Sequence, residues 1–93
     1  MTESRDTLAA HYRRLTGQEA ARRLLAEAER EEFVSLWLLA RALGCSNKRV
    51  RRDWESRGHR ITRVGHEDKV VARHAVSEYF PHADMALPPD SPA

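Results

Sequence analysis

The stretch LWLLARALGCSNKRVRRDWESR, residues 36–57, has the pattern of two short helices separated by a glycine. Ser35 can cap a helix that ends before Gly44, and Ser46 can cap a second helix over 47–56, because a serine hydroxyl accepts a hydrogen bond from the first helical turn. Glycine adopts the positive φ that so tight a turn needs. Helices joined this closely pack against each other, so the spacing predicts a helix-turn-helix unit.

Apolar residues stand in this unit where its two helices would touch. Ala40, Gly44 and Val50 occupy relative positions 5, 9 and 15. Val50 and Trp54 share one face of the second helix at about 3.6 residues per turn. Packing of that face therefore turns the cationic residues of the helix outward.

The outward residues have side chains that can recognise duplex DNA. The N-terminal half of a recognition helix enters the major groove. There arginine can bond guanine and asparagine can bond adenine, each pair contributing roughly 1–3 kcal/mol of discrimination. The sequence therefore predicts double-stranded DNA as the partner. The residues assigned to this contact are Ser46, Asn47, Lys48, Arg49, Arg51, Arg52 and Arg57 on and beside the helix, and Arg60, Arg63 and Lys69 after it.

Positive charge is concentrated in the middle of the chain, although the whole chain has a formal net charge of only +2. Residues 1–32 carry six arginines against seven acids, whereas residues 33–80 carry ten lysines and arginines against five acids. The last thirteen residues add two acids. A basic region of this kind favours a polyanionic partner.

Residues 1–32 are predicted to form a helical extension. A first helix begins at about Ser4, and Thr16 and Glu19 have the spacing of a capping box for a second helix over 17–32. The two helices can also merge into one bent helix. Their apolar residues serve either a homodimer or protein partner contacted through residues 4–32, or packing on the rest of the chain; these residues are Leu8, Tyr12, Leu15, Leu24 and Leu25.

Residues 33–80 are predicted to form the DNA-binding domain. After the basic helix, residues 59–71 contain two β-branched runs around a turn at 65–68, which is the pattern of a β-hairpin. A closing helix is predicted over 73–80. Residues 81–93 contain all four prolines of the chain and are predicted to be a disordered tail.

Composition and motifs exclude several classes of protein. With 41% hydrophobic and 32% charged residues, the chain has the composition of a soluble folded domain. Its longest apolar run, 36–40, is far below the roughly 20 residues of a membrane span, so no membrane contact is predicted. The N-terminal MTESRDT has no signal-peptide core, and the single cysteine excludes an internal disulfide. A cytoplasmic, nucleoid-associated protein is expected.

Catalysis, metal binding and cofactor binding are not predicted. His59, His66 and His74 are seven and eight residues apart, and the chain has no Cys-x-x-Cys or His-x-x-x-His pair. Histidines at such spacing are expected to lie on the surface. Cys45, next to the turn glycine, is expected to be a small core residue. No nucleophile has a base at a suggestive spacing, so the chain is not expected to be an enzyme.

Three stretches follow one another in a familiar order: FVSLWLLARALGCSNKRVRRDWESRG, RITRVG and KVVARHAVSEYF. In order and spacing they resemble the excisionase-like, MerR-related winged-helix family, with its short strand, helix, glycine turn, basic helix, two-stranded wing and closing helix. The resemblance implies a mainly α fold with a small β-hairpin wing, that is, a winged helix-turn-helix preceded by one or two N-terminal helices. It also implies a DNA-binding module of phage, plasmid or bacterial origin, acting in transcription regulation or as a directionality factor in DNA recombination.

The wing departs from the family pattern at its tip, where Gly65-His66-Glu67-Asp68 is acidic. Contacts of the wing with phosphate are therefore assigned to its strands, at Arg60, Arg63 and Lys69. Two other functions stay open. One is the DNA-recognition part of a phage packaging machine, similar to a terminase small subunit. The other is a protein–protein adaptor that uses the N-terminal helices.

Overall fold

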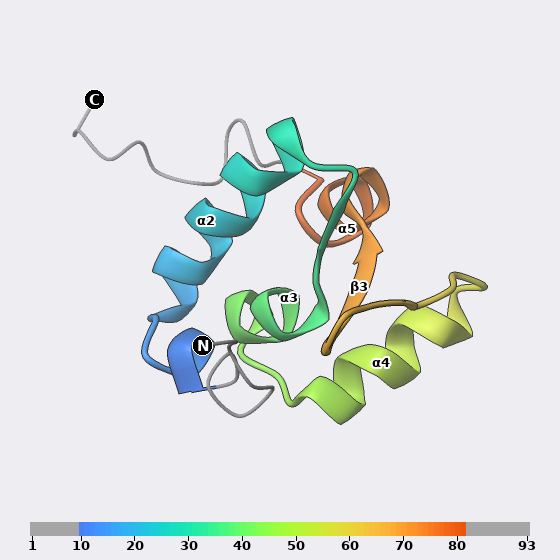
Figure 1. Ribbon diagram of the computed structural model, residues 1–93, viewed down its shortest axis with the longest axis horizontal. Helices are drawn as coiled ribbons and strands as arrows, with labels where there is room; N and C mark the ends of the chain where they lie inside the picture. The colour runs from blue at the N-terminus through green and yellow to red at the C-terminus, as the bar shows by residue number, and fades with distance from the viewer. Residues whose placement is uncertain (1–9, 82–93) are drawn as a thin grey trace.

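The computed structural model describes residues 10–81 and shows a mainly helical chain with one small antiparallel sheet (Figure 1). Residues 10–13 form a short helical turn. The predicted helix start near Ser4, with Leu8, and the segment 82–93 lie outside the described residues. The elements that follow in chain order are α2 (Gly17–Arg30), β1 (Phe33–Ser35), α3 (Leu36–Leu43), α4 (Asn47–Ser56), β2 (Thr62–Val64), β3 (Glu67–Val71) and α5 (Ala72–Tyr79).

Helix α2 begins and packs as its sequence pattern indicates. Thr16 accepts a hydrogen bond from the backbone of Glu19, whose side chain in turn accepts one from the backbone of Thr16, so the capping box is confirmed. It separates α2 from the preceding helical turn, and the alternative of one merged helix is wrong. Ala20 and Leu24 are fully buried in the same core as α3. The apolar residues of the N-terminal segment were predicted either to contact a partner or a second copy, or to pack on the rest of the chain. Those of α2 pack on the rest of the chain.

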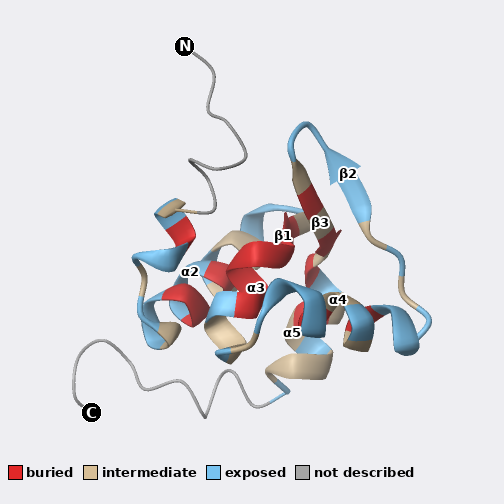
Figure 2. Cartoon of the chain, turned by 90° about the horizontal axis from the view of Figure 1, so that it is seen from below, coloured by how far each residue is buried: buried red, intermediate tan, exposed pale blue. Residues whose placement is uncertain are grey.

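Helix α3 lies at the centre of the core. Figure 2 shows the buried part of this helix between α2 and the strands β1 and β3. Ser35 accepts a hydrogen bond from the backbone of Trp37 and so caps the helix, and Gly44 ends it at φ 71°. Both features are as predicted. Trp37 is 6% exposed and belongs to the core.

Helix α4 packs on α3 through the two residues that its spacing indicated. Ser46 caps it by accepting from the backbone of Arg49, and Val50 and Trp54 are buried. The indole Nε1–H of Trp54 donates to the carbonyl of Arg60 at 2.9 Å, which fixes the chain where it leaves the helix.

The sheet has three strands, in the order β1-β3-β2, where a two-stranded hairpin was expected. The entry strand β1 pairs with β3, and this pairing places Val34 opposite Val70, both fully buried. The backbone of Ala72 also donates to the carbonyl of Glu32 at 2.8 Å. Burying these valines favours the pairing, because a lone hairpin has too little apolar surface to be stable.

The wing differs from its prediction in the placement of its acids. The turn consists of Gly65 and His66 only, since β3 already begins at Glu67. Glu67 accepts a hydrogen bond from Tyr12 Oη at 3.2 Å, and Asp68 is 6% exposed. Burial and the nearby Glu67 carboxylate raise the pKa of Tyr12 to about 12. The expectation of an acidic tip is therefore wrong. Both acids belong to β3, where alternation places them on opposite faces, and each contacts another part of the protein: Glu67 contacts Tyr12 and Asp68 contacts Arg51.

None of the helices within residues 10–81 combines the length and apolar character needed to cross a bilayer.

Candidate nucleic-acid interface

The outward side of α4 carries three exposed bases, Lys48, Arg49 and Arg52, here called the α4 strip. The strip lies away from Val50 and Trp54, which are 2% and 0% exposed. Within residues 10–81 its side chains form no hydrogen bond or ion pair, so their charges face solvent. An open depression follows the strip and is lined by Ser46, Lys48, Arg49, Arg52, Asp53 and Ser56.

The α4 strip begins at the N-terminus of the helix, where Ser46 and Asn47 are also exposed. The Ser46 hydroxyl already accepts a hydrogen bond from the backbone of Arg49 at 3.1 Å. The dipole of the helix adds partial positive charge at the same end. Ser46 and the α4 strip thus line one accessible depression, and Asn47 is exposed beside Ser46 but lines a separate depression with Tyr12 and Arg13.

Arg51 does not share this surface, although the helical wheel placed it there. Its guanidinium pairs with Asp68 on β3, and Arg63 Nη1 lies 3.5 Å from the other oxygen of the same carboxylate. The Asp68 side chain is 8% exposed, against 41% and 56% for the two arginines. The two arginines are therefore held by an internal acid and carry about one net positive charge between them.

Arg57 forms a clamp between α4 and α5. Its Nε lies 2.9 Å from Asp53, its Nη1 lies 3.2 Å from Glu78, and its guanidinium carbon lies 4.5 Å from the ring centroid of Tyr79. Tyr79 also donates its hydroxyl to Asp53. Through these contacts the guanidinium of Arg57 holds α4 and α5 together. Arg57 therefore faces α5 and is not part of the α4 strip.

Hydrogen bonding in this clamp sets the charge state of its members. Hydrogen bonds from Tyr79 and Arg57 lower the pKa of Asp53, whereas burial and the bond to Asp53 raise the pKa of Tyr79 to about 12. Because the pKa of Asp53 is lower in the folded state, the clamp adds stability above the unfolded pKa of an aspartate. That stability is lost as the pH falls through the folded pKa.

The remaining assigned residues belong to the wing. Arg60 is exposed in the loop that leads to β2, and its backbone carbonyl is held by Trp54. Lys69 is half-buried on β3, opposite Thr62 on one side and Ser35 on the other. Neither Arg60 nor Lys69 is paired with an acid in the part of the chain that the structure describes. The basic residues predicted to contact DNA thus fall into two groups. Some form no ion pair with an acid among the described residues, whereas Arg51, Arg57 and Arg63 are paired with acids of the protein itself.

Sequence reasoning missed the role of Asp68. A signal was present, since Asp68 and Val70 are two residues apart on a strand and so share its face. A buried valine at one position indicates an inward carboxylate at the other. Such a carboxylate needs a cationic partner, because an unpaired buried charge is very costly.

Replacing Asp68 with asparagine should lower the free energy of unfolding by about 1–2 kcal/mol, because the amide leaves two arginines without their anion. Urea unfolding followed by circular dichroism measures the change. Glu55→Gln, at an exposed acid on α4, is the matched control and should stay within about 0.5 kcal/mol of the unaltered chain. Equal stabilities for the two variants would contradict a structural role for the Asp68 pairs.

Comparisons with models of protein families, with curated proteins and with solved structures found no match to this chain.

Proposed function

We propose that this protein binds double-stranded DNA through α4, as a winged helix-turn-helix module does. The observation that carries the proposal is the α4 strip: three bases on one side of a helix that is anchored on its other side by Val50 and Trp54. Asp68 pairs with Arg51 and Arg63, and Asp53 pairs with Arg57, so neither acid forms an ion pair with the strip.

The dimensions of α4 suit a major groove. Its ten residues make a rod about 15 Å long, and a helix with its side chains is about 10–12 Å across, which fits the width of about 12 Å of a B-DNA major groove. In Figure 1 the helix lies at the edge of the molecule, away from α2. Figure 2 shows the hairpin tip standing clear of the helices. In this proposal the strip meets bases and phosphates, and Arg60 and Lys69 meet the backbone.

A role in transcription regulation or recombination directionality follows from the family resemblance of residues 33–80, and a nucleoid-associated location would follow from DNA binding. The alternative of an adaptor built on α2 has less support. The apolar side of α2 is used in the protein's own core, and Val64 is the one large hydrophobic residue that is exposed among residues 10–81.

The proposal is tested by replacing Lys48, Arg49 and Arg52 together with glutamine. Fluorescence anisotropy with a labelled duplex should show an affinity loss on the order of 100-fold, since three cationic contacts are removed. The slope of log affinity against log salt should fall by about 2–3, at roughly 0.9 per phosphate contact.

The matched control is Arg30→Gln, at an exposed arginine in the last turn of α2, on the side of the molecule remote from α4. The control should bind duplex DNA like the unaltered chain. The proposal would be refuted if the triple variant bound duplex DNA as tightly as the unaltered chain. It would also be refuted if the affinity of the unaltered chain did not change with salt concentration.

A further inference from the structure

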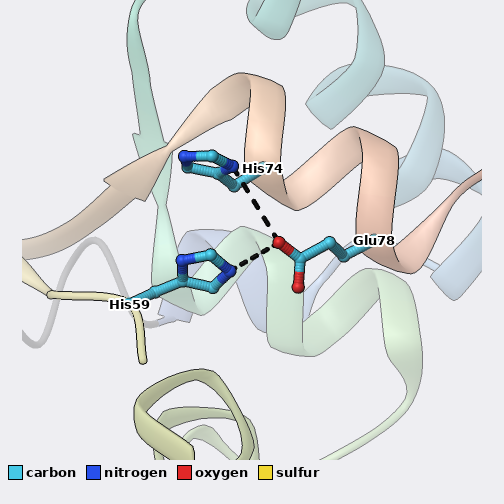
Figure 3. A group of neighbouring side chains, drawn as sticks. All are labelled: His59, His74 and Glu78. Atoms are coloured by element: carbon cyan, nitrogen blue, oxygen red, sulfur yellow. Dashed lines mark hydrogen bonds and ion pairs between the residues drawn. The ribbon is translucent and has the colours of Figure 1, made fainter. Parts of the chain in front are cut away.

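Two histidines and a glutamate that lie far apart in the sequence meet on one side of the protein (Figure 3). His59 lies in the segment after α4, and His74 and Glu78 are one turn apart on α5. Their three nearest ligand atoms all lie within 4.8 Å of one another. His59 Nε2 is 2.5 Å and His74 Nδ1 is 3.9 Å from the same oxygen, Glu78 Oε2.

The donor set matches the preferences of zinc. Imidazole nitrogens and a carboxylate oxygen bind Zn²⁺ at about 2.0–2.2 Å, and sites with three protein ligands keep the fourth position open. Around a tetrahedral ion these bond lengths place ligand atoms roughly 3.3–3.5 Å apart. The distances of 2.5 Å and 3.9 Å bracket that value, and the two histidine nitrogens lie within 4.8 Å of each other, so adjustments of at most about 1.5 Å would seat an ion.

The surrounding side chains hold the ligands in place. The ring of His59 lies between Trp54 and His74, with ring centroids 4.6 Å and 4.7 Å away. Arg57 Nη1 bonds Glu78 Oε1 at 3.2 Å, which leaves Oε2 directed at the histidines. Outer partners of this kind orient metal ligands and fix their geometry.

The charge balance around the cluster also permits a cation. Arg57 is a positive group in contact with Glu78, and Asp53 pairs with it at 2.9 Å. The side chains are 19%, 27% and 37% exposed for His59, Glu78 and His74, which leaves an entry path from solvent.

We infer that His59 Nε2, His74 Nδ1 and Glu78 Oε2 form a Zn²⁺ site, with a water or an external donor at the fourth position. The ion joins α5 to the segment that follows α4. It therefore stabilises the folded chain by an amount that grows with the logarithm of the ratio of the free Zn²⁺ concentration to the dissociation constant. The inference is independent of DNA binding.

Isothermal titration of the full chain with ZnCl₂, after treatment with a chelator and dialysis, should show one ion bound per chain. The midpoint temperature of thermal unfolding should rise by about 5 °C or more when Zn²⁺ is in excess. Titration with Co²⁺ should give the visible absorption of a four-coordinate ion with nitrogen and oxygen ligands.

His74→Gln is the principal variant, since His74 is the most exposed ligand and its replacement disturbs the fold least. It should weaken Zn²⁺ binding by at least about 10-fold, and His59→Gln should do the same. His66→Gln, at the exposed wing turn, is the matched control and should bind Zn²⁺ like the unaltered chain. Circular dichroism verifies that each variant is folded. Undiminished binding in the His59 and His74 variants, or no binding by the unaltered chain, would overturn the inference.

Discussion

Replacing Trp54 with alanine is expected to lower the free energy of unfolding by about 3–5 kcal/mol, as is typical of a large aromatic residue removed from a packed core. Trp54 is fully buried, lies 6.0 Å from the ring of Tyr79 and donates its Nε1–H to the carbonyl of Arg60. Its removal leaves a cavity under α4 and frees the chain that leads to the wing. Chemical denaturation followed by circular dichroism measures the loss.

The Trp54→Phe variant distinguishes the contribution of the aromatic ring to stability from that of the Nε1–H hydrogen bond. Phenylalanine keeps an aromatic ring in the core but cannot donate to Arg60, so we expect a smaller loss of about 1–2 kcal/mol. Under the proposed function, affinity for a DNA duplex is the second measurement. The phenylalanine variant should still fold, so any weakening of binding reports a displaced wing. A loss below about 1 kcal/mol for Trp54→Ala would show that Trp54 does not anchor α4.

Replacing Leu24 with alanine is expected to lower the free energy of unfolding by about 2–5 kcal/mol. Leu24 is fully buried and belongs to the core cluster that also contains Val34 and Trp54. If α2 is part of one cooperative unit, the whole molecule loses stability and unfolds in a single transition. Urea unfolding monitored by both tryptophan fluorescence and circular dichroism tests this.

Leu25→Ala supplies a matched control on the next residue of the same helix. Leu25 is half-buried, and the helix turns it away from the core face of Leu24. Its replacement should cost no more than about 1 kcal/mol. Equal losses at the two positions, or two separate transitions in the Leu24 variant, would indicate that α2 is an independent appendage.

Local signals in the sequence predicted most of the helical framework. The serines before α3 and α4, the glycine between them and the inward pair Val50 and Trp54 all occupy the expected places. These features succeed because capping and helical periodicity depend on residues only a few positions apart. The mainly helical fold with a small sheet follows from the same signals.

The remaining features depend on contacts between distant segments. Pairing of β1 with β3 joins strands more than thirty residues apart, and Arg51 meets Asp68 across seventeen residues. Helical periodicity placed Arg51 on the outward side but could not show that an acid stands beside it. The cluster of His59, His74 and Glu78 likewise exists only because α5 returns to the end of α4. Neither an ion pair nor a ligand set of this kind has a spacing rule in the sequence.

The position of β3 in the middle of the sheet limits how the chain can be divided. β1 covers one edge of β3, and β2 covers the other. A fragment that starts at α3 would lack β1 and leave a row of backbone amides and carbonyls without partners. An uncovered strand edge recruits strands from other molecules and promotes aggregation. The smallest portion able to remain monomeric at high concentration therefore has to include Phe33, upstream of the helices that carry the α4 strip.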